Sequence, residues 1–318
     1  MLEIKKLTKR FGDFTAIDNI SFTVNDGEVV GFLGPNGAGK STTMKIVTGY
    51  LAPTSGTAII DGKDIQDFSD ETRAKIGYLP ERNPLYDELQ VKEYLSFVAE
   101  LRGVEKKKRS QKIDEMIEIC GLQKMLYRSI GDLSKGFRQR VGLAQSLIHD
   151  PDIVVMDEPT SGLDPNQIIE IRELIKEIGK TKTVILSTHI LPEVQETCNR
   201  MIIINEGKIV AQGTTEELTK ADKQKENVIV SLKCEDKETI AQELRHLPYV
   251  EKVEEHERAE QGTERFRIVG SHDMREDIFK LSHKHNWPIM EMFREQVSLE
   301  KVFRNLTQDS SKEPTEKK

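Results

Sequence analysis

The chain has 318 residues, with 47 lysines and arginines against 54 aspartates and glutamates, so its formal net charge at pH 7 is −7. The length predicts one large domain and a smaller one, and the acidic balance argues against a broad basic surface for nucleic acid. Apolar runs are too short to predict a membrane span, and Met1–Lys6 lacks the apolar stretch of a secretory signal, so we expect a cytoplasmic protein. Cys120, Cys198 and Cys234 are too dispersed for a disulfide framework and are expected to be small buried residues.

Short apolar runs alternate with helical patterns from residue 1 to about 220. Parallel strands that are covered by helices on both faces have this largely apolar composition. The region is therefore predicted to be an α/β domain with a largely parallel sheet. The best strand candidates are Val29–Leu33, Ile153–Met156, Thr183–Ser187 and Met201–Ile204.

A glycine-rich segment follows the first of these strands. Gly34–Ser41 fits the phosphate-binding pattern G-x-x-x-x-G-K-[ST], and a predicted helix at Thr42–Thr48 stands behind it. Glycines let the backbone wrap around phosphate oxygens, and the helix N-terminus adds partial positive charge. Lys40 is predicted to supply a mobile cation and Ser41 a magnesium ligand. The predicted nucleotide site comprises Gly34, Pro35, Asn36, Gly37, Ala38, Gly39, Lys40, Ser41 and Thr42.

Residues 86–130 have a different pattern, in which apolar residues recur at helical spacing. We predict a helical insertion here. Its two apolar faces are Val91, Tyr94, Leu95 and Val98, and then Ile113, Met116, Ile117 and Cys120.

The apolar strand Ile153–Met156 ends in two acids, Asp157 and Glu158. Adjacent carboxylates after a phosphate loop can divide two tasks of phosphoryl transfer. Asp157 is predicted to hold magnesium, and Glu158 to polarise an attacking water.

The segment Leu133–Val141, Leu-Ser-Lys-Gly-Phe-Arg-Gln-Arg-Val, resembles the signature motif of the ATP-binding subunits of ABC transporters. Asp157–Pro165 resembles the Walker B motif and D-loop of this family, and Thr188-His189 resembles its switch histidine. Phe11 stands where the family stacks an aromatic ring on adenine. These motifs occur in the family's order and cover residues 1 to about 220.

This resemblance implies the P-loop NTPase (ABC ATPase) fold with a helical subdomain, and ATP hydrolysis with Mg²⁺. Lys40, Glu158 and His189 would carry catalysis. The ATPase would then be coupled to transmembrane transport.

The resemblance also implies a head-to-tail dimer with two ATP molecules between subunits. Ser134 and Gly136 would bind the γ-phosphate of the partner's nucleotide, and Asp164 would lie across the interface. The dimer would be a homodimer or a pair with a paralogous cassette. It would dock on a separate polytopic membrane subunit, peripherally on the cytoplasmic face of the cell membrane, and residues near Asn83–Tyr86 would line the docking groove.

Three positions depart from the family pattern. Glu81 stands where the Q-loop places glutamine, and its carboxylate is still able to bind magnesium. Lys135 and Phe137 replace the usual first glycine and glutamine of the signature. These departures, the sequence Gly136–Gln145 and the C-terminal sequence Ser298–Phe303 resemble those of one export branch of the family. That branch includes drug-resistance exporters and the gliding-motility-associated ATPase.

A second pattern begins at Asn227, after the polar stretch Thr219–Glu226. We predict residues 1–221 as the ATP-binding domain, 222–308 as a small accessory domain and 309–318 as a disordered tail. The order β-α-β-β-α-β suggests a ferredoxin-like α+β domain that contacts its twin or tunes ATPase activity. Its strands are expected at Val228–Leu232, Tyr249–Val253, Arg265–Val269 and Ile289–Phe293, with helices around Ile240–Leu247, around Met274–Leu281 and from Ser298.

Two other functional classes fit the sequence less well. A soluble ABC ATPase acting on ribosomes or nucleic acid is disfavoured, because the chain has one cassette and no long coiled coil between its phosphate loop and Asp157. A nucleotide-binding regulator that barely hydrolyses ATP is weakened by the joint presence of Glu158 and His189. The transported cargo is not predicted, since its recognition belongs mainly to the membrane subunit.

Overall fold

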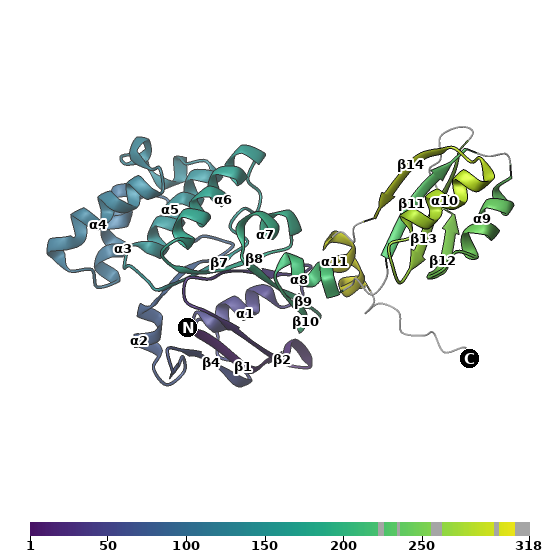
Figure 1. Cartoon of the computed structure of the whole chain (residues 1–318). Helices are drawn as coiled ribbons and strands as arrows, with labels where there is room; N and C mark the ends of the chain where they lie inside the picture. The colour runs from purple at the N-terminus through teal and green to yellow at the C-terminus, as the bar shows by residue number, and fades with distance from the viewer. Residues whose placement is uncertain (222–225, 234–235, 256–262, 296–298, 309–318) are drawn as a thin grey trace. The chain divides into compact units, whose positions relative to one another are not determined.

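A six-stranded sheet forms the centre of the first part of the chain, with the strand order β10-β9-β3-β8-β7-β6 (Figure 1). Five strands are parallel, and β10 alone runs antiparallel to its neighbour β9. This confirms the predicted α/β architecture. The strands are β3 (Val29–Leu33), β6 (Ile76–Leu79), β7 (Ile153–Asp157), β8 (Thr183–Thr188), β9 (Arg200–Asn205) and β10 (Lys208–Gly213).

The computed structural model describes residues 1–221, 226–233, 236–255, 263–295 and 299–308. The chain divides into two compact units. Among the described residues, one unit comprises Met1–Thr215 together with residues 306–308, and the other comprises those within Glu216–Asn305. Each unit is described by itself.

The continuous apolar composition of the strands reflects two cores, one on each face of the sheet. In β7, Val154 and Met156 pack against the helical side, whereas Ile153 and Val155 pack against the opposite side. Because successive side chains of a strand point to opposite faces, both sets must be apolar when both faces are covered.

A second, antiparallel sheet with the order β2-β1-β4-β5 covers one of these cores. None of its strands is among the strand candidates of the sequence. Gly12, with φ at +57°, lies in the turn between β1 and β2 and sets Phe11 opposite Phe14. The strands are β1 (Leu2–Phe11), β2 (Phe14–Val24), β4 (Ser55–Ile60) and β5 (Lys63–Asp64).

The helices at residues 91–101 and 106–119 form the predicted helical insertion and pack in the core on the other face. The apolar residues of the insertion are buried, including Val91, Leu95 and Cys120, which confirms the helical spacing. The helix at residues 40–47 instead packs in the core between the two sheets. Cys198 is half-buried, and Cys234 lies outside the described residues. The helices are α1 (Lys40–Val47), α2 (Ser69–Ala74), α3 (Val91–Leu101), α4 (Lys106–Ile119), α5 (Lys135–Leu147), α6 (Pro165–Gly179), α7 (Leu191–Thr197) and α8 (Thr215–Ala221), with short 3₁₀ turns at Gln123–Met125 and Ile130–Asp132.

The second unit has the predicted order β-α-β-β-α-β, and its sheet order is β12-β13-β11-β14 with every pair antiparallel. Val230, Phe266 and Ile268 form its core with Leu244 and Ile278 from the helices. The ferredoxin-like assignment and the domain bounds stay predictions. Residue 298, the predicted start of the last helix, and the predicted tail 309–318 lie outside the described residues. The elements are β11 (Glu226–Leu232), α9 (Lys237–Arg245), β12 (Val250–Glu255), β13 (Glu264–Gly270), α10 (Arg275–His285), β14 (Ile289–Arg294) and α11 (Leu299–Gln308).

In the part of the chain that the structure describes, every helix is too short or too polar to traverse a lipid bilayer.

Candidate functional site

The glycine-rich segment forms a loop between β3 and α1, and α1 begins at Lys40, two residues earlier than predicted. Gly39 has φ at +104°, and a Cβ there would lie 2.6 Å from the carbonyl oxygen of Ala16. Only glycine fits this close approach without strain. The Lys40 ammonium is buried and donates to the carbonyl oxygens of Gly34 at 2.8 Å and Pro35 at 3.2 Å. The loop therefore curls around its own lysine.

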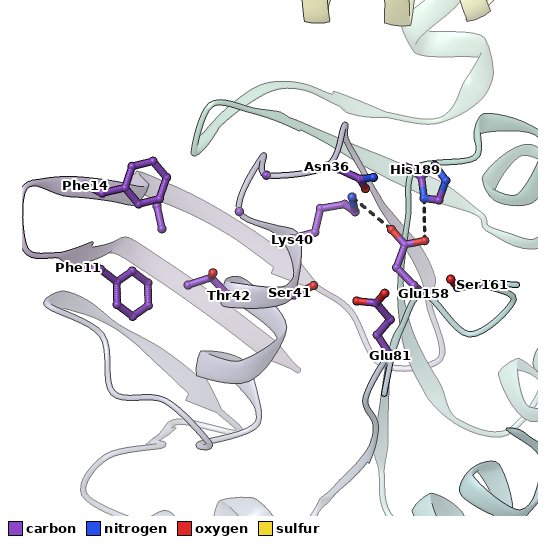
Figure 2. A pocket seen from close by; sticks show the side chains of 13 residues that line it. Phe11, Phe14, Asn36, Lys40, Ser41, Thr42, Glu81, Glu158, Ser161 and His189 are labelled. Carbon is purple, nitrogen blue, oxygen red and sulfur yellow. Dashed lines mark hydrogen bonds and ion pairs between the residues drawn. The ribbon is translucent and has the colours of Figure 1, made fainter. Parts of the chain in front are cut away.

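Three predicted catalytic side chains meet at the carboxyl edge of the parallel sheet (Figure 2). Glu158 Oε1 lies 3.2 Å from Lys40 Nζ, and Glu158 Oε2 lies 2.9 Å from His189 Nδ1. Glu158 follows β7 and His189 follows β8, which are adjacent parallel strands, so their carboxyl ends lie side by side. The structure thus places Glu158 between a cation and an imidazole.

The backbone at Glu158 is in the left-handed region, with φ at +48°. This conformation is uncommon for a residue with a side chain and is found where surrounding contacts hold it. The Glu158 N–H donates to the Ser187 carbonyl oxygen at 3.0 Å and lies 3.2 Å from the Ser187 hydroxyl. These contacts with β8 turn the buried carboxylate toward Lys40.

Asp157 lies beside the first turn of α1. The Ser41 hydroxyl donates to Asp157 Oδ1 at 3.1 Å, and the Ser187 hydroxyl donates to the same oxygen. Hydroxyl and carboxylate oxygens are the ligands that Mg²⁺ prefers. The donor set of Ser41 and Asp157 therefore fits a magnesium ion, and Glu81 adds a carboxylate close to Ser41 (Figure 2).

A cavity of 470 Å³ joins these groups to the turn between β1 and β2. Phe11 and Phe14 lie at one end of the cavity, and Lys40, Glu158 and His189 lie at the other (Figure 2). The full lining is Phe11, Phe14, Ala16, Asn36, Gly37, Gly39, Lys40, Ser41, Thr42, Glu81, Glu158, Ser161 and His189. Sequence reasoning missed Phe14, Ala16 and Ser161. The only signal for Phe14 was a second aromatic residue just across a glycine turn from Phe11.

Six predicted nucleotide-binding residues do not line this cavity, namely Gly34, Pro35 and Ala38 in the loop, and Ser134, Gly136 and Asp164 farther along the chain. Ser134 is the N-cap of α5, where its hydroxyl oxygen lies 3.5 Å from the Phe137 N–H. Asp164 is the N-cap of α6, and its carboxylate accepts from two backbone N–H groups of the first turn. Gly136 packs against Gln167 of α6, so the two helix starts lie close together. They form a separate surface of the same unit.

A second cavity, of 560 Å³, shares Ser41 and Glu81 with the first. Pro84 lines it, whereas the Asn83 amide donates to the Arg138 carbonyl oxygen and Tyr86 packs edge-on against Tyr94. Burial raises the pKa of the Tyr78 phenol in this cavity, and the charge of Asp157 raises it further. Glu81 therefore lines both cavities, close to Ser41 in each. The full lining is Ser41, Lys45, Tyr50, Tyr78, Pro80, Glu81, Arg82, Pro84, Arg102, Gln145 and Asp157.

Comparison with known proteins agrees with this arrangement. The ABC transporter family model matches residues 17–161. The chain is 38% identical over 253 residues to the uncharacterized ABC transporter ATP-binding protein YxlF of Bacillus subtilis, an alignment that covers 80% of this chain and 82% of that protein. The chain belongs to the ATP-binding subunits of ABC transporters. Cassettes of this family are ATPases coupled to transport.

Two further relatives are similar to this cassette. The probable multidrug ABC transporter ATP-binding protein YbhF of Escherichia coli is 42% identical over 219 residues, which cover 69% of this chain and 38% of that longer protein. A dimeric ATP-binding cassette in a post-hydrolysis state, bound to ADP and Pi, superposes with a TM-score of 0.61 at 27% identity and covers 67% of this chain and 98% of its own. The P-loop NTPase fold of the ABC ATPases is thereby confirmed.

Proposed function

We propose that this cassette is the ATP-hydrolysing subunit of an exporter, and that it couples ATP binding and hydrolysis in a dimer to a separate membrane-spanning subunit. The observation that carries the proposal is the buried Glu158 carboxylate between Lys40 and His189, at the end of a nucleotide-sized cavity. A carboxylate in that position is suited to take a proton from a water that attacks phosphorus.

We assign a role to each of the groups that line the cavity. The Phe11 ring offers a face to adenine, and the loop N–H groups and Lys40 bind the phosphates. Ser41 and Asp157, with Glu81 nearby, would hold a magnesium ion, which supplies positive charge to the phosphate oxygens. His189 keeps the Glu158 carboxylate oriented while Lys40 turns to the γ-phosphate.

We propose a dimer because the predicted nucleotide-binding residues Ser134, Gly136 and Asp164 do not line the cavity of their own subunit. Ser134 and Asp164 are exposed on one surface of the unit, so they are available to the nucleotide of a second subunit. Gly136, at the start of α5, is instead buried against the Gln167 side chain. The similar cassette bound to ADP and Pi is dimeric. A complete set of catalytic residues in this chain favours a homodimer, with a paralogous cassette as the other possibility.

Coupling to a membrane subunit follows from the family and from the second cavity, which offers a recess next to Glu81. We place the cassette in the cytoplasm, peripherally at the cell membrane. Export is supported by the similarity to YbhF, a probable multidrug ABC transporter ATP-binding protein. The gliding-motility subgroup stays a prediction from the signature string and the last helix, and the soluble ATPase class is not favoured.

The test is affinity purification of tagged Glu158→Gln protein from detergent-solubilised membranes with ATP and Mg²⁺. We expect a polytopic membrane protein in stoichiometric amount, because a cassette that binds but does not hydrolyse ATP keeps the closed complex. The matched control is the same variant with ADP, which should recover less of the membrane protein. Recovery of ribosomes or DNA-associated proteins in its place would overturn the transporter assignment.

A further inference from the structure

A buried carboxylate that takes no part in the proposed mechanism lies behind the catalytic pair. Glu193, in α7, is 1% exposed. Its Oε1 accepts a hydrogen bond from the Thr160 hydroxyl at 2.5 Å, and its Oε2 accepts one from the Thr188 hydroxyl at 2.7 Å. Within the described ranges of the chain, no lysine, arginine or histidine forms an ion pair with this carboxylate. The hydrogen-bond donors to this carboxylate are therefore two hydroxyl groups.

The two threonines flank the catalytic pair on both sides. Thr160 follows Glu158 by two residues, and Thr188 directly precedes His189. The Thr188 hydroxyl also accepts from the Ile190 N–H at 3.1 Å, so the backbone is fixed before and after the histidine. Glu193 thus ties the segment after β7 to the end of β8, directly behind the 2.9 Å contact between His189 and Glu158.

The charge of Glu193 also affects the pKa of a neighbouring thiol. Burial raises the pKa of Cys198 to about 12, and the Glu193 carboxylate contributes to the increase. A buried carboxylate without a cation is costly, and it persists where its hydrogen bonds are fully made. Both threonine hydroxyls are buried as well, so truncating Glu193 leaves them without their acceptor.

We infer that Glu193 is a positioning residue, which sets the distance between His189 and Glu158 and anchors the segment that leads from Thr160 to Asp164. The inference rests on the proposed ATPase mechanism. Its physical basis is geometric, because a displacement of about 1 Å at a reacting group costs on the order of 10²-fold in rate. Asp164 stands at the far end of the anchored segment, so the same contact would also fix the surface offered to a second subunit.

The test compares Glu193→Ala and Glu193→Gln in ATP hydrolysis and nucleotide binding. Glu193→Ala is expected to lower kcat on the order of 10²-fold with little change in KM, because the cavity itself contains no atom of Glu193. Glu193→Gln is expected to restore most of the rate, since its amide keeps one acceptor and offers a donor to the second hydroxyl. An unchanged kcat in Glu193→Ala would overturn the inference.

A double-mutant cycle separates positioning from general stability. In a His189→Ala background, adding Glu193→Ala should cost less than about threefold, because the distance that Glu193 sets no longer exists. A residue with only a structural role would cost the same factor in both backgrounds, and that result would refute the inference. Should Glu193→Ala fail to fold, Thr160→Val and Thr188→Val each remove one donor with little change of shape, and the same cycle applies to them. ATP hydrolysis by the wild type, and its loss in Glu158→Gln, test the proposed function separately.

Discussion

Lys40 Nζ lies 3.2 Å from Glu158 Oε1, and both side chains are almost completely buried. The lysine proposed to bind phosphate and the carboxylate proposed to activate water are therefore partners in one ion pair. A γ-phosphate bound by Lys40 would compete with Glu158 for the same ammonium, which would couple nucleotide binding to release of the carboxylate. This relationship links the first two predictions.

Glu158→Gln should reduce ATP turnover by at least about 10²-fold while ATP binding is retained. The amide keeps the shape of the side chain but is a very weak proton acceptor. Phosphate release under saturating ATP and equilibrium binding of a fluorescent ATP analogue measure the two properties separately. A variant with the wild-type hydrolysis rate would contradict the assignment of Glu158 as the carboxylate that activates water.

Lys40→Met should lower the free energy of unfolding by on the order of 3 kcal/mol, because it leaves the buried Glu158 carboxylate without its cation. Combining it with Glu158→Gln should recover most of that loss, since no buried charge remains to be neutralised. Urea unfolding of the single and double variants provides the measurement. Additive losses in the double variant would mean that the pair contributes nothing in the folded protein.

Phe11→Ala should weaken ATP binding about tenfold, which corresponds to about 1.4 kcal/mol of lost stacking, with kcat at saturating ATP unchanged. Phe68→Ala is a matched control. The Phe68 ring has similar exposure, 45% against 49%, and it also lies under a lysine ammonium, but it does not line the cavity. Equal ATP affinity of the Phe11→Ala and wild-type proteins would show that Phe11 does not stack on adenine.

Ser134→Ala should abolish the ATP-dependent dimer of Glu158→Gln while it lowers the free energy of unfolding by at most about 1 kcal/mol. The expected stability cost is small because the Ser134 hydroxyl makes only a 3.5 Å contact with the Phe137 N–H. Light scattering with and without ATP measures the dimer. Ser96→Ala, which alters a hydroxyl on α3, is the control and should leave the dimer intact. A full dimer in Ser134→Ala would exclude the proposed contact with a second nucleotide.

Stability should fall at alkaline pH through Cys120, whose pKa burial raises from 9.0 to about 12. Below pH 9 the thiol is protonated in both states. Between pH 9 and about 12 the unfolded chain releases a proton that the folded chain retains, so the free energy of unfolding falls by up to about 1.4 kcal/mol per pH unit. Cys120→Ala should flatten this slope in urea unfolding from pH 8 to 10. Parallel curves for the two proteins would contradict the prediction.

Local sequence patterns are sufficient to predict several features of this protein. The pattern Gly34–Ser41 requires positive φ angles and a helix start, and the apolar residues of Ile153–Met156 require a strand covered on both faces. Helical spacing likewise indicated the buried face of residues 91–98. These features depend on neighbours within a few residues, so a pattern is enough to predict them.

Which of these features come into contact depends on the tertiary fold. Glu158 contacts His189 because β7 and β8 are adjacent, and Lys40 reaches Glu158 because α1 begins at the carboxyl edge of the same sheet. Phe14 enters the cavity through a hairpin, and Glu193 is buried behind the site by the packing of α7 on the sheet. The order of strands depends on contacts between residues far apart in the chain, which carry no periodic signal in the sequence.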